Sequence, residues 1–600
     1  MRHIEDEVYR SAPGKRGRWG LLLLLTLLYA CTSSGPAPTP QPDTQPTPGG
    51  SVLQRGVMRP QDRGQLEALL LQGERALAAG DLTTASAAEA QITAGLTLPD
   101  KASAFSPALA LRWAQLRSAL AFTEGDTLRS ATLLLQAQAQ APEDQRQPLI
   151  DLAFDRLIAT LPPPALPAEA TDALAAYHDL AQSLADCAPL PARLPQAIAE
   201  WQARWPGQTL PARLRHLPRP DSGNDPLRIA VLLPFTGPLQ GAAEALRDGL
   251  LAAQFEAQRQ GYGGSALRFF DTRAADLPRA YGQALSFQPD QLLGPLDREA
   301  VSALDALRQD ETQAPPLLAL NRPSEGSAPT LWTYALEPEV EGEQLADQNW
   351  RAGHRRLLIL HDEAPWAQRL ALAASTHFEA LGGIVARRQP FSPNEDLGAT
   401  VAAALLVEEG EARSQALRRV LRVPLETEPR RRQDVDSVLL IAEPLQGQTL
   451  KSALAYYFAG DLPVWASSQG LASDLSATAL KDLESVTFSL TPWQLAQGDP
   501  TSQRLRAAFP EAEGALGLLY ALGVDAWRLA QWQRYAPPGL PFPGLTGQLS
   551  QTEDQRWVRT LRLAFIERGA LRPRPARLAL PPAAVPPAAP PAAPFSYPPR

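Results

Sequence analysis

The chain has 600 residues, of which 44% are hydrophobic and 20% charged. This length exceeds what one hydrophobic core usually organises, so we expect two or more packed units. The formal net charge is −8 at pH 7, which argues against nucleic acid as a partner. Two cysteines, Cys31 and Cys187, cannot build a disulfide framework, and we expect Cys187 to be a buried, small hydrophobic side chain.

The N-terminus reads as a targeting segment. Arg16 and Arg18 precede an apolar run from Trp19 to Ala30, which is too short for a membrane span of about 20 residues. The run ends in LYAC, a lipobox in which small Ala30 precedes Cys31. Residues 1–30 are therefore predicted to be a lipoprotein signal peptide, with Cys31 as the lipidated residue. The alternative is a short buried helix.

The residues after the cysteine predict the membrane that holds the lipid anchor and an extended tether. Thr32 stands where an aspartate would retain a lipoprotein at the inner membrane, so we expect a lipid anchor in the outer membrane, facing the periplasm. Residues 31–52 are rich in proline and poor in apolar side chains. They predict an extended tether between the lipid and the folded body.

Residues 53–205 are predicted to be an all-α domain. Alanine and leucine recur there at a spacing of three to four. Gly80-Asp81 and Gly125-Asp126 each follow one helical pattern and precede another, 45 residues apart. This arrangement resembles tetratricopeptide-like (TPR-like) helical repeats. An ordinary helical bundle with two chance Gly-Asp turns is the alternative.

The pattern changes after a polar, proline-rich linker at residues 206–226. Across residues 227–575, buried strands alternate with helices of ten or more residues, which predicts parallel sheets covered on both faces. Two such runs predict two Rossmann-like lobes. The strands are expected at residues 227–235, 266–272, 290–295, 316–321, 355–362, 384–391, 434–443 and 462–468. Residues 576–600, rich in proline and alanine, are predicted to be a disordered tail.

Several stretches carry a family resemblance. VLLPFTGPLQGAAEALRDGLLAA, FFDT, LLGPLDREAVSAL and LLALN resemble the type I periplasmic-binding fold of branched-chain amino-acid receptors. RRRQDVDSVLLIAEPLQG, YYFAGDLPVWASSQG, LESVTFSLTPW, LYALGVDAWRLA and GLTGQLS are similar to the penicillin-binding protein activator lipoproteins, the LpoA family. The resemblance implies an outer-membrane lipoprotein that binds a class A penicillin-binding protein and stimulates peptidoglycan synthesis, with no catalytic residue of its own.

A search for catalytic motifs agrees with a non-enzymatic role. No lysine completes a Ser-x-x-Lys motif, because the residues three positions before the lysines are Ala12, Leu98, Gln448 and Thr478. The sequence has no Gly-x-Ser-x-Gly elbow, and its six histidines include no pair at helical metal-ligand spacing. We expect His354 and His361 at the surface, and we predict no catalytic site, metal or cofactor.

Two groups of residues are candidates for binding. In a two-lobed fold, ligands bind in the crevice at the carboxyl ends of the strands, where Thr236, Asn321 and Arg322 are expected. Pro295 removes an amide donor there, so a cage for a free amino acid looks incomplete. Periplasmic binding of an amino acid or muropeptide remains the alternative function.

The second group is a run of three arginines, Arg430, Arg431 and Arg432, which lies just before a predicted strand. Adjacent guanidinium groups can steer an acidic partner surface, so this run is a candidate partner patch. A solvated loop of mixed charge is the alternative.

Overall fold

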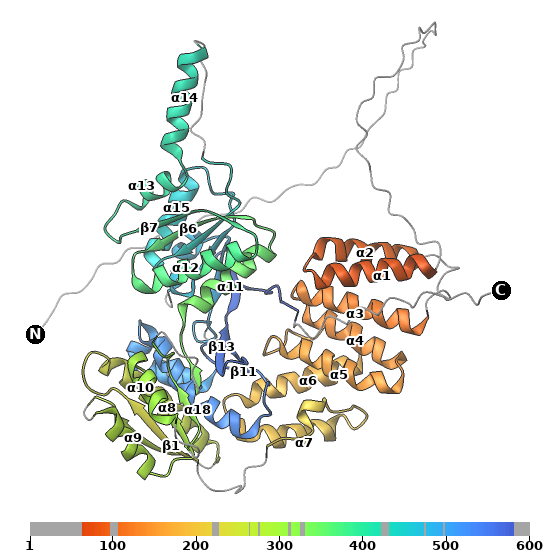
Figure 1. Ribbon diagram of the computed structural model, residues 1–600, viewed down its shortest axis with the longest axis vertical. Coiled ribbons are helices and arrows are strands. Elements are labelled where there is room, and N and C mark those ends of the chain that lie inside the picture. Colours follow the sequence, from red (N-terminus) through yellow and green to blue (C-terminus); the bar gives the residue numbers. More distant parts are fainter. Residues whose placement is uncertain are drawn as a thin grey trace, which may run out of the picture. The chain divides into compact units, whose positions relative to one another are not determined.

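The structure is a computed structural model of the chain (Figure 1). It describes residues 63–96, 106–218, 227–262, 265–273, 276–309, 314–324, 331–421, 431–472, 476–495 and 498–580. The predicted signal peptide and tether lie outside these ranges, and so do Cys31 and Arg430.

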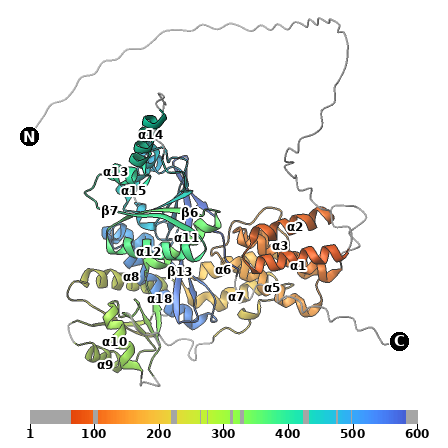
Figure 2. The same cartoon turned by 45° about the horizontal axis from the view of Figure 1, so that its top comes forward.

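The first described part is helical, as the sequence predicts. Its elements are α1 (Arg63–Ala78), α2 (Leu82–Leu96), α3 (Pro107–Thr123), α4 (Thr127–Gln140), α5 (Glu143–Ile158), α6 (Asp172–Cys187), η2 (Pro191–Arg193), α7 (Leu194–Arg204) and η3 (Ala212–Leu214). Successive helices lie side by side in Figures 1 and 2, with α1 on α2, α3 on α4, and α4 on α5. This succession of paired helices is the TPR-like arrangement.

Both Gly-Asp turns end one helix and begin the next. Gly80 and Gly125 have φ of +75° and +87°, a region that a residue without Cβ enters freely. The carboxylates of Asp81 and Asp126 accept the backbone N–H three residues further on, at 3.0 and 2.9 Å. Each Gly-Asp pair therefore supplies a helix C-terminus and the N-cap of the next helix.

The rest of the described chain forms two mixed sheets and the helices that cover them. The first, lobe 1, has eight strands in the order β11-β12-β13-β5-β4-β3-β1-β2, and the second, lobe 2, has seven in the order β15-β14-β10-β9-β8-β6-β7. The strands are β1 (Arg228–Leu233), β2 (Ala266–Asp271), β3 (Gln291–Leu293), β4 (Leu317–Ala319), β5 (Trp332–Tyr334), β6 (Arg356–Asp362), β7 (Ile384–Phe391), β8 (Ser437–Ile441), β9 (Val464–Ala466), β10 (Val486–Leu490), β11 (Phe542–Pro543), β12 (Gln548–Gln551), β13 (Arg556–Thr560), β14 (Arg562–Glu567) and β15 (Ala570–Arg574).

Helices cover both faces of each sheet. They are α8 (Gln240–Arg259), α9 (Leu277–Ser286), α10 (Arg298–Arg308), α11 (Pro338–Arg351), α12 (Pro365–Ala380), α13 (Leu397–Ala404), α14 (Val407–Leu421), α15 (Pro444–Tyr456), η4 (Ser468–Gly470), α16 (Ala477–Asp482), α17 (Pro500–Ala508), η5 (Pro510–Glu513) and α18 (Gly517–Tyr535). In β1, Ile229, Val231 and Leu233 pack with α8 and α18, while Ala230 and Leu232 pack with α9 and α10. Such alternation is what a strand buried on both faces requires.

The sheets are less regular than predicted. The eight predicted strands all form, but β5 and β10 to β15 were not among them, and the pairs β10–β14, β14–β15, β11–β12 and β12–β13 are antiparallel. The eight predicted strands pair with one another in parallel, as expected, and the sheets are mixed because of the strands that were not predicted. Because β6 to β10 lie in lobe 2 and β11 to β13 return to lobe 1, the chain crosses between the lobes before β6, before β11 and before β14.

The predicted linker packs on the protein where it is described. Leu214 is buried in the core that the later helices share with lobe 1, and Tyr177 Oη donates to the Thr209 carbonyl at 2.8 Å. The side chain of Gln548, at the start of β12, accepts from Leu161 N at 2.7 Å. The described part of the linker is thus anchored to the protein by the Leu214 side chain and the Thr209 carbonyl.

The first residues of the predicted tail are also bound. The Gln348 amide of α11 donates to the Arg577 carbonyl at 2.7 Å and accepts from Arg577 N at 2.8 Å. Leu580 packs against the apolar cluster of α1 to α3. Residues 576–580 therefore contact both α11 and the helical part. The tail that composition predicted to begin at residue 576 is bound to the protein as far as residue 580.

Candidate functional site

Buried carboxylates fix the segments that cross between the lobes. Asp525 of α18 is fully buried and accepts from Leu545 N at 2.7 Å, Thr546 N and Thr546 Oγ1 at 2.8 Å, and Tyr334 Oη at 3.2 Å. Tyr334 ends β5 immediately before the first crossing. Burial raises the pKa of Asp525 above its ordinary value. The Asp525 carboxylate therefore connects α18 to the end of β5, which precedes the first crossing, and to the turn before β12.

Glu341 holds the corresponding junction in lobe 2. Its side chain, on the first turns of α11, is 3% exposed. It accepts from Ser468 N and Ser489 Oγ at 2.5 Å and from Ser468 Oγ at 3.0 Å. The first turns of α11 are thereby fixed to the ends of two strands of the lobe 2 sheet.

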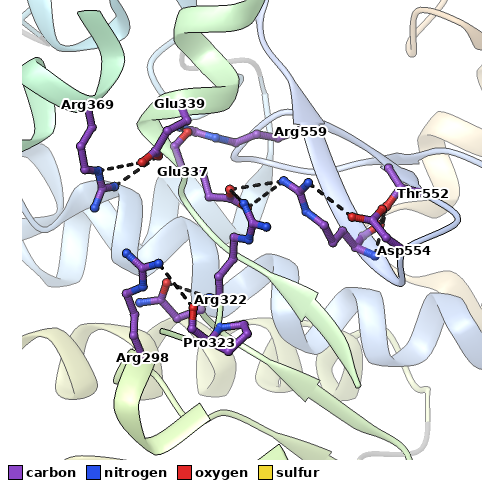
Figure 3. A network of polar contacts seen from close by, with 11 residues as sticks. Arg298, Arg322, Pro323, Glu337, Glu339, Arg369, Thr552, Asp554 and Arg559 are labelled. Atoms are coloured by element: carbon purple, nitrogen blue, oxygen red, sulfur yellow. Dashed lines mark hydrogen bonds and ion pairs between the residues drawn. The ribbon is translucent and has the colours of Figure 1, made fainter. Parts of the chain in front are cut away.

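The crevice between the lobes contains a charged network centred on Glu337 (Figure 3). The Glu337 carboxylate pairs with Arg322 Nη1 at 3.0 Å and with Arg556 Nη2 at 3.3 Å. Its backbone carbonyl accepts from Arg559 Nη2 at 3.3 Å. Next to it, Glu339 pairs with Arg369 of α12 at 2.9 Å. Guanidinium groups from β13, from α12 and from the loop after β4 thus converge on the start of α11.

Two adjoining cavities lie along this network. One, of about 220 Å³, is lined by Asn321, Arg322, Glu337 and Glu339 among others. The other, of about 530 Å³, is lined by Trp366, Leu518 and Arg559 among others. Arg369 lines both. The second volume falls within the range of small-molecule sites.

The structure brings together two of the three residues predicted for the crevice. Asn321 and Arg322 line the smaller cavity, whereas Thr236 is exposed in the turn after β1 and is not among its lining residues. Asn321 Nδ2 donates to the Leu296 carbonyl, and Asn321 Oδ1 accepts from Arg322 N, both at 2.9 Å. Asn321 therefore shapes the turn, while the Arg322 guanidinium is paired with Glu337.

Sequence reasoning missed Glu337, Arg369 and Arg559. The EPEVE run, Glu337 to Glu341, offered a signal, since acidic residues around a proline mark a helix start. Nothing local marks Arg559, which is separated from Glu337 by 222 residues.

The described arginines of the candidate partner patch have partners within the protein. Arg431 is 9% exposed, and its Nη2 pairs with Asp461 at 2.7 Å. Arg432 forms two bonds of 2.7 Å with Asp434, and this pairing holds the pKa of the Asp434 carboxyl well below its usual range. Both side chains therefore stabilise the segment that leads into β8.

Other predicted residues are placed as follows. Cys187 is buried, as expected, and burial raises the pKa of its thiol to about 12. His361 was expected at the surface, but it is the sixth residue of buried β6 and is 5% exposed.

Within the described ranges, no helix is long and apolar enough to span a membrane, and no cluster of His, Cys, Asp and Glu side chains could hold a metal ion.

Fold and crevice together define a class of protein: a two-lobed, type I periplasmic-binding-protein-like body preceded by TPR-like helices. A family profile described as "LppC putative lipoprotein" matches residues 61–569. The chain belongs to this lipoprotein family.

Similar curated proteins carry the name that the sequence resemblance suggested. A "Penicillin-binding protein activator LpoA" of Vibrio antiquarius is 26% identical over 58% of this chain and 58% of its own length. One from Edwardsiella ictaluri is 26% identical over 85% of this chain and 87% of its own length. The match thus spans less than two thirds of the Vibrio protein but most of the Edwardsiella one.

Solved structures of Haemophilus influenzae proteins match as well. Full-length LpoA is 22% identical over 85% of this chain and 88% of that chain, with a TM-score of 0.45. Its C-domain, described as "a regulator of PBP1A", is 25% identical over 58% of this chain and 99% of that chain, with a TM-score of 0.44.

Proposed function

We propose that this chain is an outer-membrane lipoprotein that binds a class A penicillin-binding protein and activates its synthesis of peptidoglycan. The observation that carries the proposal is the family match across residues 61–569, which spans both the helical and the two-lobed parts. The names of the relatives support it, since the Edwardsiella protein is similar along most of both chains and is called a penicillin-binding protein activator.

Activation by binding needs no catalytic residue in this chain. A bound protein shifts its partner between two conformations by the difference in its affinity for them. Shifting a partner from mostly inactive to mostly active requires about 5.5 kcal/mol of such difference, which a specific protein interface can supply. The tethered body would dock on the synthase's competent conformation and so raise peptide cross-linking.

A lipid II assay with the cognate synthase tests this role. The chain from Thr32 to Arg600 should increase peptide cross-linking by the synthase. The same concentration of unfolded chain in the assay controls for effects of added protein that do not require its folded structure. Absence of both stimulation and measurable binding would defeat the proposal.

The location is a separate proposal, supported by the lipobox and by membership of a lipoprotein family. Cys31 carries the lipid, and Thr32 directs the protein outward. Fractionation of cells that express wild type or Cys31→Ala should find the wild type in the outer-membrane fraction and the variant outside that fraction. If the variant stays in the same membrane fraction, Cys31 is not the anchor.

The arginine run remains a proposed contact surface for the synthase. Because Arg431 and Arg432 hold the segment before β8, replacing them would mix structural and binding effects. Arg430→Glu is the informative substitution. It should weaken binding to an acidic surface on the synthase, with Arg388→Glu, an exposed position on β7, as the control. Equal binding by both variants would remove the patch from the interface.

A further inference from the structure

One outward face of lobe 2 carries almost no charge. Helices α13 and α15 contact each other (Figures 1 and 2) and pack on the same side of the sheet, where Val401 and Leu454 share one apolar core. Lys451 is the only charged residue of these two helices, although 20% of the whole chain is charged. On its outward side α13 exposes only small side chains, Ala399 and Ala403. Depletion of charge is typical of the centre of a protein interface.

The outward side of α15 is a stripe of uncharged side chains. Leu445, Thr449, Ser452 and Tyr456 are all exposed and recur at spacings of three and four, so they lie on one side of the helix. Leu445 and Tyr456 are 76% and 75% exposed. The Thr449 hydroxyl donates to the Leu445 carbonyl at 3.0 Å, so its hydrogen bond is made within the helix. Large apolar side chains exposed on one stripe mark a surface that another molecule covers.

Phe458 extends this stripe at the end of α15, in a backbone conformation that disfavours it. Its φ is +60°. The Ala459 N–H donates to the Leu454 carbonyl at 2.8 Å, which places Phe458 at the position after a helix where glycine is usual. The Phe458 side chain is nevertheless 64% exposed. A side chain that strains the backbone and buries little surface is unfavourable for folding, which points to a role in binding.

Both aromatic side chains are held in place by neighbours. The Tyr456 ring meets the Tyr457 ring edge to face, with centroids 4.9 Å apart, and Tyr457 packs against the core of lobe 2. Arg431 Nε donates to the Phe458 carbonyl at 2.9 Å, and Arg431 Nη2 pairs with Asp461 at 2.7 Å. These contacts restrict the two aromatic residues before a partner arrives, which reduces the entropy lost on binding.

The exposed aromatic area is large enough for the centre of an interface. Phe and Tyr side chains each bury about 150–250 Å² when they are covered, so at 64% and 75% exposure Phe458 and Tyr456 offer roughly 200–350 Å². That is at least about a quarter of the roughly 800 Å² that each partner contributes to a standard interface. The rest of the stripe and the alanines of α13 supply further area around the two rings.

Lys451 adds one cation beside the stripe. Burial alone lowers the pKa of its ammonium group, since no carboxylate among the described residues pairs with it. A carboxylate on the partner would supply the missing negative charge. The surface that fits this face is therefore apolar at its centre and acidic at one point of its edge.

The same lysine disfavours two other occupants. Residues 445–456 have their midpoint close to Lys451, so two copies packed about a twofold axis would bring their Lys451 ammonium groups together without a counter-charge. A lipid surface is disfavoured because helices that bind membranes carry several basic residues beside their apolar side. A single lysine gives little attraction to anionic headgroups.

We propose that the α13–α15 face, meaning the outward sides of α13 and α15 together with Phe458, docks on the peptidoglycan synthase. Tyr456 and Phe458 insert into apolar pockets of the synthase, and Lys451 meets one of its carboxylates. This inference rests on the proposed activator function and assigns the interface through which it acts. The face adjoins the arginine run, since Arg431 bonds the Phe458 carbonyl.

Binding of the chain from Thr32 to Arg600 to the cognate synthase in detergent, measured by biolayer interferometry, tests the face. Phe458→Gly removes the ring and suits the positive φ, so the protein should be at least as stable to heat while its affinity falls about tenfold or more. Gln288→Gly, at an exposed position of lobe 1 with φ of +52°, is the matched control and should bind like wild type. Wild-type affinity of Phe458→Gly, or an equal loss in both variants, would overturn the proposal.

Two further sets of variants test the stripe and its cation. The double variant Leu445→Ser with Tyr456→Ser, at exposed positions, should keep its circular dichroism spectrum and lose affinity by about a hundredfold. Lys451→Gln should weaken binding by about threefold at low salt, and Lys451→Arg should preserve it. Wild-type affinity of the folded double variant would contradict the assignment.

The outcomes separate the interface from the function. If wild type neither binds nor stimulates the synthase, the activator function and this interface both fall. If wild type and the double variant bind and stimulate equally, only the interface falls. Light scattering and sedimentation with vesicles of anionic phospholipid examine the other occupants. A wild-type dimer, or vesicle binding, that the double variant loses while it still binds the synthase would assign the face to a second copy or to lipid instead.

Discussion

The helical and two-lobed parts differ in the hydrogen bonds that hold their neighbouring elements together. In the helical part, a Gly-Asp pair ends one helix and caps the next, with hydrogen bonds that span three to five residues. In the two-lobed part, Asp525 joins residues up to 212 positions apart through Tyr334 and Thr546. Local junctions can be read from a short stretch of sequence, whereas buried long-range junctions depend on packing that brings distant residues together.

The largest effect is expected at the buried junction. Asp525→Ala removes the acceptor of two backbone N–H groups and of the Tyr334 and Thr546 hydroxyls, which keep only their contact with each other. The free energy of unfolding should fall by about 4 kcal/mol. Urea unfolding followed by tryptophan fluorescence measures it. Asp554→Ala, which removes an exposed carboxylate, is the control, and similar losses in the two variants would show that the buried network contributes little.

The next effect concerns the close contact of α8 with α18. A Cβ on Gly523 would lie 2.2 Å from the Leu246 carbonyl oxygen, so the helix backbones must separate to accept it. Gly523→Ala should cost about 3 kcal/mol. Gly241→Ala is the matched change at a helical position of α8 with nothing within 4 Å, and it should stabilise the protein by up to about 1 kcal/mol. Thermal unfolding distinguishes the two, and equal shifts would contradict the close contact.

A smaller difference separates the two Gly-Asp turns. Alanine at Gly80 or Gly125 is strained at positive φ by about 1 kcal/mol. A Cβ on Gly80 meets nothing within 4 Å, but one on Gly125 would lie 2.3 Å from the Ala576 carbonyl oxygen. Gly125→Ala should therefore be the more destabilising, and truncation after Arg574 should abolish the difference. If the two substitutions cost the same in the full chain, residues 575–580 do not pack on this turn.

The smallest effect is kinetic. Burial raises the pKa of Cys187 from 9.0 to about 12, so its thiol stays protonated and covered at pH 9 in the folded protein. Because the folded pKa exceeds the unfolded one, the stability linked to this group is present below pH 9 and is lost as the pH rises toward 12. Iodoacetamide should label Cys187 slowly at pH 9 and rapidly in urea. Equal rates would show that α6 opens readily.

Much of the fold follows from local sequence. The strand predicted at residues 384–391 is β7 to the residue, and the turns at Gly80 and Gly125 form where the Gly-Asp pairs stand. These elements are set by hydrophobic periodicity and by the backbone freedom of glycine, which act within a few residues. The lipobox and the family resemblance are likewise properties of short segments.

Tertiary structure alone decided the rest. The strands β11 to β15 join the two sheets through pairings with distant partners, β13 in parallel with β5 and β14 antiparallel to β10. Composition alone placed residues 576–580 in a free tail, although they pack on α11 and on the helices. In the crevice, sequence reasoning found Asn321 and Arg322 but not Glu337 or Arg559, because a guanidinium on β13 meets the start of α11 only after two sheets have formed and the chain has crossed between them. A charged residue's role is set by its burial and its partners, and neither is a property of the local sequence.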